Sequence, residues 1–307
     1  MLTSAVTGAQ TFATAYLEQL ADKVIPEEHA VLTAEDARAT YFRDADALEV
    51  KQSIHDRFRT NPKALHDHLL EALALRGTEE LLDLGCGNAF VLERLRPHLA
   101  AGHLTGLDIS PAMLAAARHR LAGVATPCEW IEGTADRLDA LADDTFDRVM
   151  CVYTAHYVAD LGRCFAEVRR VLRPGGRFLL TTDRPDSMVE MYDVHLHALR
   201  TLDGPDHLAK ASSKARISLT NGRRHLVGHF EQIRLLEWQD QLQFADVAPF
   251  LAFYRASYHC SASAGPDPAS PALLAALEEH VAAAVADAID ARGYFAVTKL
   301  SGTFICS

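Results

Sequence analysis

The residues around a short glycine loop could bind a charged small molecule. Gly85 and Gly87 lie within Leu-Leu-Asp-Leu-Gly-Cys-Gly-Asn-Ala, residues 81–89, where an apolar run gives way to a helical pattern. Glycines at such a turn let the backbone bend tightly and let a ligand approach it closely. Asp83 precedes the first glycine by two residues, and its charge would repel a phosphate and attract an ammonium group. The loop therefore suits a zwitterion better than a pyrophosphate.

Two other interpretations of this loop are a dinucleotide site and a tight turn that binds nothing. The dinucleotide fingerprint G-x-G-x-x-G requires a third glycine where this chain has Phe90. Glycine at that place lets the helix pack closely on the strand, and phenylalanine is a poor substitute. A turn without a ligand is compatible with the loop taken alone.

Three further aspartates fall at the ends of expected strands. Asp108 closes Leu-Thr-Gly-Leu-Asp before a helix start, where a carboxylate can accept two hydrogen bonds from a ribose diol. Asp136 follows the third expected strand and is placed to accept a hydrogen bond from an adenine amino group. Asp147 begins the fourth expected strand, and we interpret it as a turn residue. Asp83, Asp108 and Asp136 are therefore expected to converge on one ligand.

Alternating strand and helix patterns position these residues. Short apolar runs alternate with helical ones from residue 80 to residue 182, at the spacing of right-handed crossovers between parallel strands. Two later runs, 233–243 and 294–306, are expected to pair as an antiparallel edge. We predict an α/β fold with a doubly wound, mostly parallel seven-stranded sheet, an antiparallel edge strand and added N-terminal helices.

Helical spacing of apolar residues predicts further helices outside this pattern. Asn61 and Pro62 are expected to cap and begin one of them, and Gly77 to end it. The helices are expected over residues 10–25, 34–58, 61–76, 246–258 and 271–291.

Taken together, these motifs resemble the class I S-adenosylmethionine-dependent methyltransferases of the bacterial small-molecule type. LLDLGCGNA resembles the family's first motif, GLDISPAML its second-strand acid and following helix, and EGTAD its adenine-edge motif. TFDRVMCVYTAHYV looks like the fourth strand, and EVRRVLRPGGRFLL like the helix, Pro-Gly-Gly turn and fifth strand. The match covers about residues 60–182 and is looser over 220–306. It implies a Rossmann-like fold, S-adenosylmethionine as cofactor and methyl transfer to a small molecule.

The resemblance also implies roles for individual residues. Asp83 and the loop backbone would hold the methionine end of the cofactor, Asp108 would clamp the ribose hydroxyls, and Asp136 would read the adenine edge. Ala89, where many members have a third glycine, is a departure from the motif. Other candidates would pack on the adenine, flank its edge or lie near the sulfonium. The full cofactor-binding set is Asp83, Gly85, Cys86, Gly87, Asp108, Ile109, Met113, Ala135, Asp136, Arg137 and Cys151.

Methyl transfer chiefly requires that nucleophile, methyl carbon and sulfur are held in line. A general base is needed only where the acceptor must lose a proton early. His156 is the candidate base, because imidazole titrates near neutrality, although we favour its interpretation as a polar residue of the pocket wall. Tyr153 and Tyr157 could orient the acceptor through a hydroxyl or a ring face.

The resemblance and the element pattern together divide the chain into four parts. The first could close over the bound cofactor as a lid or simply cover the sheet, with Tyr41-Phe42-Arg43 and Arg57-Phe58-Arg59 as its contact residues. The parts are an N-terminal helical cap or lid (1–60), a cofactor-binding core (61–183), a substrate cover (184–230) and a C-terminal completion of the sheet with helices (231–307).

Charge, hydropathy and cysteine content limit the kinds of partner that this protein is expected to bind. The formal net charge of −11 argues against binding to DNA or RNA, which requires a basic surface. The chain has no uncharged apolar run of 18 residues and does not begin with a secretion-signal pattern. The six cysteines are scattered without a C-x-x-C pair, as free thiols in a reducing cytoplasm would be. We expect a cytoplasmic monomer or homodimer with a small-molecule substrate and without nucleic-acid or membrane partners.

The histidines do not predict a metal site. His225 and His229 have the four-residue spacing of a helical ligand pair, but the glycine between them argues against a helix.

Two alternatives to a methyltransferase share the same fold. One is an enzyme that uses the sulfonium for other chemistry, and the other is a non-catalytic partner subunit. The cofactor motifs do not separate the first alternative from methyl transfer, because they report binding alone. A degraded glycine loop would mark the second, whereas this loop is nearly intact.

Overall fold

The computed structural model describes residues 37–38, 42–43, 45–124, 126–205, 208, 216–259 and 268–307. The helix expected over 10–25 and the expected helix start near residue 34 lie outside these residues, as does Tyr41 of the predicted lid. Within the described part, α3 (Asp46–Phe58) confirms the later portion of the helix expected over 34–58.

One mixed sheet carries the fold, with its strands in the order β3-β2-β1-β4-β5-β7-β6. Neighbouring strands among the first five pair in parallel, whereas β7 runs antiparallel to both β5 and β6. The predicted seven-stranded sheet and its antiparallel pair are therefore confirmed, with β7 enclosed and β6 at the edge. The strands are β1 (Glu80–Leu84), β2 (His103–Asp108), β3 (Cys128–Glu132), β4 (Phe146–Val152), β5 (Leu172–Asp183), β6 (Ile233–Phe244) and β7 (Phe295–Cys306).

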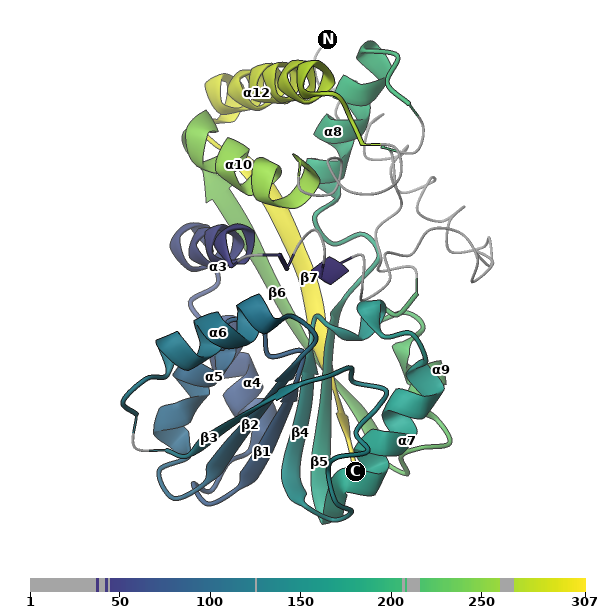
Figure 1. Cartoon of the computed structure of the whole chain (residues 1–307). Coiled ribbons are helices and arrows are strands. Elements are labelled where there is room, and N and C mark those ends of the chain that lie inside the picture. The colour runs from purple at the N-terminus through teal and green to yellow at the C-terminus, as the bar shows by residue number, and fades with distance from the viewer. Residues whose placement is uncertain are drawn as a thin grey trace.

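Helices cover both faces of the sheet (Figure 1). On one face of the sheet, an apolar cluster packs the strands against α4 (Leu65–Leu73), α5 (Phe90–Leu95) and α6 (Pro111–Arg120). A second cluster joins the other face to α7 (Leu161–Val171) and to the end of α9 (Gly222–Leu226). This is the doubly wound arrangement that right-handed crossovers produce.

Short polar residues fix where several helices begin. The Ser110 side chain accepts a hydrogen bond from the Met113 N–H at 3.3 Å, and Pro111 occupies the first turn of α6. Asp160 accepts from the Arg163 N–H at 2.9 Å at the start of α7. Because parallel strands end at the same edge of the sheet, these caps hold the helix starts beside the strand ends.

The last two strands extend beyond the rest of the sheet. β5 pairs with β7 only over residues 301–306, whereas β6 pairs with β7 over 295–306. The remaining halves form a two-stranded ribbon that rises above the carboxyl ends of the parallel strands (Figure 1). A third apolar cluster packs this ribbon against α3, α8 (Val189–Thr201), α10 (Val247–Tyr254) and α12 (Pro271–Arg292). The helices predicted over 246–258 and 271–291 are thereby confirmed.

The helix predicted from Asn61 is wrong at its start. The Asn61 side chain accepts a hydrogen bond from the Lys63 N–H at 2.9 Å and so forms a turn before the helix. Asp67 instead accepts from the Ala64 N–H at 3.0 Å, and α4 begins one residue after Ala64. The helix also ends before Gly77, because Ala74 takes the left-handed conformation with a φ of 48°.

Candidate cofactor and acceptor site

The glycine loop lies at the carboxyl end of β1, and Gly85 is packed too tightly for any side chain. Its φ is +75°, and an added Cβ would lie 2.2 Å from Cγ2 of Thr154. The Thr154 hydroxyl donates to the Gly85 carbonyl at 3.3 Å, so the loop is tied to the turn that follows β4. Gly87 has a φ of +54°, which also favours glycine. The side chains of Thr154 and Leu48 therefore fill the space beside the two glycines.

The amide groups of this loop are already paired within the protein. The N–H groups of Gly85 and Cys86 donate to the Leu107 carbonyl at 2.7 and 3.0 Å. The Gly87 N–H donates to Asp108 at 2.8 Å. These three N–H groups are therefore already used within the protein, so the predicted contact between the cofactor and the loop backbone would have to involve other backbone groups.

Asp108 is held at the end of β2 by backbone groups. Its second oxygen accepts from the Ser110 N–H at 2.9 Å, and only 8% of the residue is exposed. Burial raises the pKa of its carboxyl, while hydrogen bonds from Ser110 and Gly87 act in the opposite direction. The carboxylate thus connects the glycine loop to the start of α6, where the predicted ribose clamp would lie.

Asp83 has an unsatisfied buried oxygen. The residue is 3% exposed, and Oδ1 has no hydrogen-bond partner among the described residues. Burial raises the pKa of Asp83 to about 8, and the nearby charge of Asp108 adds to this effect. A buried carboxylate without a partner is costly, so the site favours a ligand that carries positive charge.

The remaining cofactor candidates occupy the ends of β2 to β4. Ile109 is half-buried, whereas Met113 has no exposed surface in the first turn of α6. Asp136 is buried and accepts from the Asp160 N–H at 3.1 Å, which joins the loop after β3 to the start of α7. Ala135 is buried and Arg137 is exposed. Their predicted contacts with an adenine stay predictions.

Two thiols lie near these carboxylates. Cys151 is completely buried in β4, and burial raises its pKa to about 12. Burial likewise raises the pKa of Cys86 in the glycine loop. Thiols in this state are inert as nucleophiles, so both residues act through shape and backbone.

The three predicted acceptor-side residues follow β4. Tyr153 has a φ of 53°, and its hydroxyl donates to the Ser301 hydroxyl at 3.0 Å. His156 and Tyr157 lie on a short 3-10 helix (Ala155–Tyr157), with ring centroids 4.0 Å apart. Phe42 packs edge-on against Tyr157 at 5.5 Å, so the N-terminal part reaches this wall. All three predicted side chains are half-buried.

A buried polar cluster beside Tyr153 was missed by the sequence reasoning. The Lys299 ammonium lies 2.8 Å from Oδ1 and 2.9 Å from Oδ2 of Asp183, and 4.5 Å from the centre of the Tyr153 ring. The Ser301 hydroxyl donates to Asp183. Burial is the largest effect and lowers the pKa of Lys299, but the charge of Asp183, its hydrogen bond to the ammonium and the nearby Tyr153 together outweigh burial, and the pKa is raised. Alternation along 294–306 places Lys299 and Ser301 on one face, which was the available signal.

Helix α3 lies across the glycine loop and is fastened to it. Gln52 and Asn88 exchange two amide hydrogen bonds, each of 3.0 Å. Arg94 binds Asp56 at 2.7 Å, and Arg120 binds Glu49 at 3.1 Å. Phe58 is one of the residues with which the lid was expected to contact the cofactor. It packs on Phe244 at the end of β6, with ring centroids 4.9 Å apart.

Comparisons with known proteins agree with this geometry. Residues 82–180 match the methyltransferase domain family. The phthiotriol/phenolphthiotriol dimycocerosates methyltransferase of Mycobacterium tuberculosis is 32% identical over 142 residues, which are 45% of this chain and 51% of the relative. The part of this chain that contains β1 to β5 is thus similar in sequence to known methyltransferases.

Two further relatives define how far the similarity extends. A sterol 4-C-methyltransferase of Caenorhabditis elegans is 31% identical over 120 residues, 38% of this chain and 35% of the relative. A protein from an antibiotic biosynthesis pathway of Anabaena variabilis shares the fold with a TM-score of 0.57 at 17% identity, covering 79% of this chain and 96% of that one. The chain thus spans about half or less of the length of the two curated relatives.

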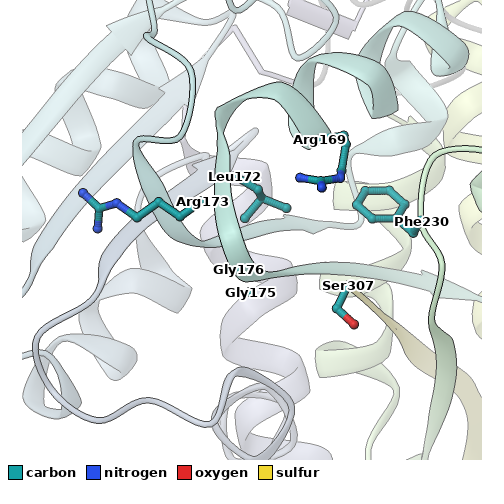
Figure 2. A pocket seen from close by; sticks show the side chains of 7 residues that line it. All are labelled: Arg169, Leu172, Arg173, Gly175, Gly176, Phe230 and Ser307. Atoms are coloured by element: carbon teal, nitrogen blue, oxygen red, sulfur yellow. The ribbon is translucent and has the colours of Figure 1, made fainter.

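A surface hollow lies at the opposite end of the sheet, at the amino end of β5 (Figure 2). Arg169 and Arg173 border it, together with Gly175 and Gly176 and with Ser307 after β7. Asp147, also at this end, accepts from the Glu80 N–H at 3.0 Å and binds Arg173 at 2.7 Å. These contacts agree with its interpretation as a structural turn residue.

Two features are absent from the part of the chain that the structure describes. No group of three or more histidine, cysteine or acidic side chains is arranged to hold a metal ion there. None of the helices described is long and apolar enough to cross a membrane.

Proposed function

We propose that this protein transfers the methyl group of S-adenosylmethionine to a small-molecule acceptor. The observation that supports this most directly is the unpartnered buried carboxylate of Asp83, two residues before the glycine loop at the end of β1. S-adenosylmethionine carries a sulfonium, an ammonium and a carboxylate, so its net charge complements that of Asp83. A pyrophosphate would be repelled by Asp83 and Asp108.

The residues present fit this cofactor. When bound, S-adenosylmethionine supplies a methyl group already activated on sulfur. Asp83 would compensate the charge of the methionine end, and Asp108 would accept hydrogen bonds from the ribose hydroxyls. Ile109 and Asp136 would contact the adenine. The chain itself contributes orientation and exclusion of water, which together supply much of the rate in reactions of this kind.

The acceptor would lie between the end of β4 and the ribbon of β6 and β7. Tyr153 reaches both, because it follows β4 and its hydroxyl donates to Ser301 of β7. His156 and Tyr157 would form the adjoining wall, and His156 would serve as base only for an acceptor that must lose a proton early. The names of the relatives refer to a sterol and to lipid acceptors, and we infer a small-molecule acceptor here as well. A cytoplasmic location and a monomeric or homodimeric state stay predictions.

Asp108→Ala tests the ribose clamp. We expect wild type to bind S-adenosylmethionine and the variant to bind it roughly tenfold or more weakly, because two hydrogen bonds of about 1–1.5 kcal/mol each are lost. Isothermal titration calorimetry with S-adenosylmethionine and S-adenosylhomocysteine measures this. Asp147→Ala, at the other end of the sheet, is the control and should bind like wild type. If Asp108→Ala bound S-adenosylmethionine as tightly as wild type, Asp108 would not be the residue that holds the ribose.

Gln52→Ala tests whether α3 retains the cofactor as a lid. The variant loses both amide hydrogen bonds to Asn88, at about 0.5–1.5 kcal/mol each, so S-adenosylhomocysteine should dissociate at least about fivefold faster. Stopped-flow displacement measures the dissociation rate. Ser53→Ala, on the exposed side of the same helix, should leave it unchanged. Equal rates in wild type and Gln52→Ala would indicate that α3 merely covers the sheet.

A further inference from the structure

The ribbon above the sheet carries a second buried acid that lacks a full set of partners. Asp240 of β6 is 7% exposed, and its Oδ1 accepts from the N–H groups of Thr60, Asn61 and Gln241 at 3.1, 2.9 and 2.8 Å. Its Oδ2 is buried and has no hydrogen-bond partner among the described residues. One oxygen is therefore saturated by the backbone, while the other is shielded from water and unpaired. Such an atom favours a hydrogen-bond donor or a cation.

The nearest candidate cation already has another partner. Lys299 is paired with Asp240 across β6 and β7, so the two side chains leave the ribbon on the same face. Its ammonium, however, is bound by both oxygens of Asp183. Lys299 and Asp183 neutralise each other, and the charge of Asp240 is left over. The cluster as a whole thus carries a net negative charge.

Tyr153 connects this cluster to the place where the methyl group would be transferred. Its ring lies against Lys299, and the next residue, Thr154, is bonded to the glycine loop. Tyr153 is half-buried, whereas Lys299, its ion-pair partner Asp183 and the opposite residue Asp240 are all buried. Burial raises the pKa of Tyr153 to about 12; Lys299 opposes this shift, and Asp183 and Asp240 add to it. An anionic acceptor group is therefore disfavoured at this place.

We propose that Oδ2 of Asp240 recognises a protonated amine on the methyl acceptor, which approaches from the side of Tyr153. The amine serves for recognition and is distinct from the atom that receives the methyl group. Lys299 and Asp183 hold the Tyr153 ring, so that the rest of the acceptor packs between this ring and the cofactor loop. This inference rests on the proposed methyltransferase function and assigns an acceptor class to it.

Three probes with one scaffold test the charge preference. They are 2-phenylethylammonium, its neutral N-acetyl derivative and the anion 3-phenylpropanoate. Binding to the protein saturated with S-adenosylhomocysteine is measured by ligand-observed NMR titration. We expect wild type to bind the ammonium probe at least tenfold more tightly than either of the others, as a hydrogen bond to a charged partner of about 1.5–3 kcal/mol would give.

Asp240→Asn is the decisive variant, because it keeps the Oδ1 acceptor for the three backbone N–H groups and removes the charge. This variant should lose the tenfold preference for the ammonium probe over the other two probes, while it retains the wild-type affinity for S-adenosylhomocysteine. Asp246→Asn makes the same change at an exposed position just beyond β6 and should keep the preference. The proposal would be overturned if wild type showed no preference for the ammonium probe or bound the anion most tightly. It would also be overturned if both variants lost the preference for the ammonium probe equally. Failure to bind S-adenosylhomocysteine at all would instead refute the proposed function.

Discussion

Asp83→Asn is expected to stabilise the ligand-free protein and to weaken binding of S-adenosylmethionine at least about 100-fold. The carboxylate is buried with an unpaired Oδ1 and a pKa raised to about 8, so at pH 8 and above the folded state holds a poorly solvated charge. Asparagine keeps the shape and removes that charge. Loss of the buried partner of a cation costs about 3–5 kcal/mol, which corresponds to 100-fold or more in affinity.

The raised pKa of Asp83 determines how the free energy of unfolding of the ligand-free protein changes with pH. Because the folded-state pKa of Asp83 lies above its unfolded value, its stabilising contribution is complete below about pH 4 and is lost as the pH rises to about 8. The stability advantage of Asp83→Asn over wild type should therefore grow between these values, to about 2 kcal/mol or more. Denaturant unfolding at several pH values measures it.

Cofactor binding should show the opposite trend. The cation favours the ionised carboxylate, so wild-type affinity for S-adenosylmethionine should rise with pH up to about 8, and protons should be released on binding at pH 7. Calorimetry in two buffers of different ionisation enthalpy detects the release. Asp246→Asn, an exposed control, should behave like wild type in both measurements. A variant that binds normally, or that is less stable than wild type at pH 8, contradicts the role given to Asp83.

The parts of the fold that were predictable are those governed by local pattern. The run at 81–84 and the glycines after it specify a strand and a tight turn, and Asp108 follows a strand of the same kind. Convergence of these residues follows from parallel strands ending at one edge. The start of α4 was not predictable in this way, because Asn61 and Asp67 are both suitable caps and tertiary contacts decide between them. Asn61 is held by Asp240, which is distant in sequence.

The residues on the acceptor side are brought together by pairing between distant strands, so most of their contacts could not be predicted from the sequence. Asp183 and Lys299 are 116 residues apart, and their contact requires β7 to lie between β5 and β6. The sequence indicated that the last two runs pair with each other, but not that β7 also pairs with β5. Without that pairing, the ion pair between Asp183 and Lys299 does not follow from the residue types.

Gly85→Ala is the substitution for which we expect the greatest loss of cofactor binding without replacing any charged group. The added Cβ would lie 2.2 Å from Cγ2 and 2.4 Å from Oγ1 of Thr154, so either the glycine loop or the turn after β4 must move. Both border the predicted methionine site. A displacement of this size should weaken binding of S-adenosylmethionine about tenfold or more, since overpacking of this kind costs about 1–3 kcal/mol.

The backbone conformation itself costs only about 1–2 kcal/mol for a residue other than glycine, and a control separates this cost from the collision. Gly123 has a similar φ of +73° but nothing within 4 Å of an added Cβ. Gly123→Ala should therefore lose a little stability and bind the cofactor normally. Thr154→Gly should restore part of the affinity when combined with Gly85→Ala, because it removes all three colliding atoms. Calorimetry on the four proteins measures these differences, and equal binding by Gly85→Ala and Gly123→Ala would show that the loop does not border the cofactor.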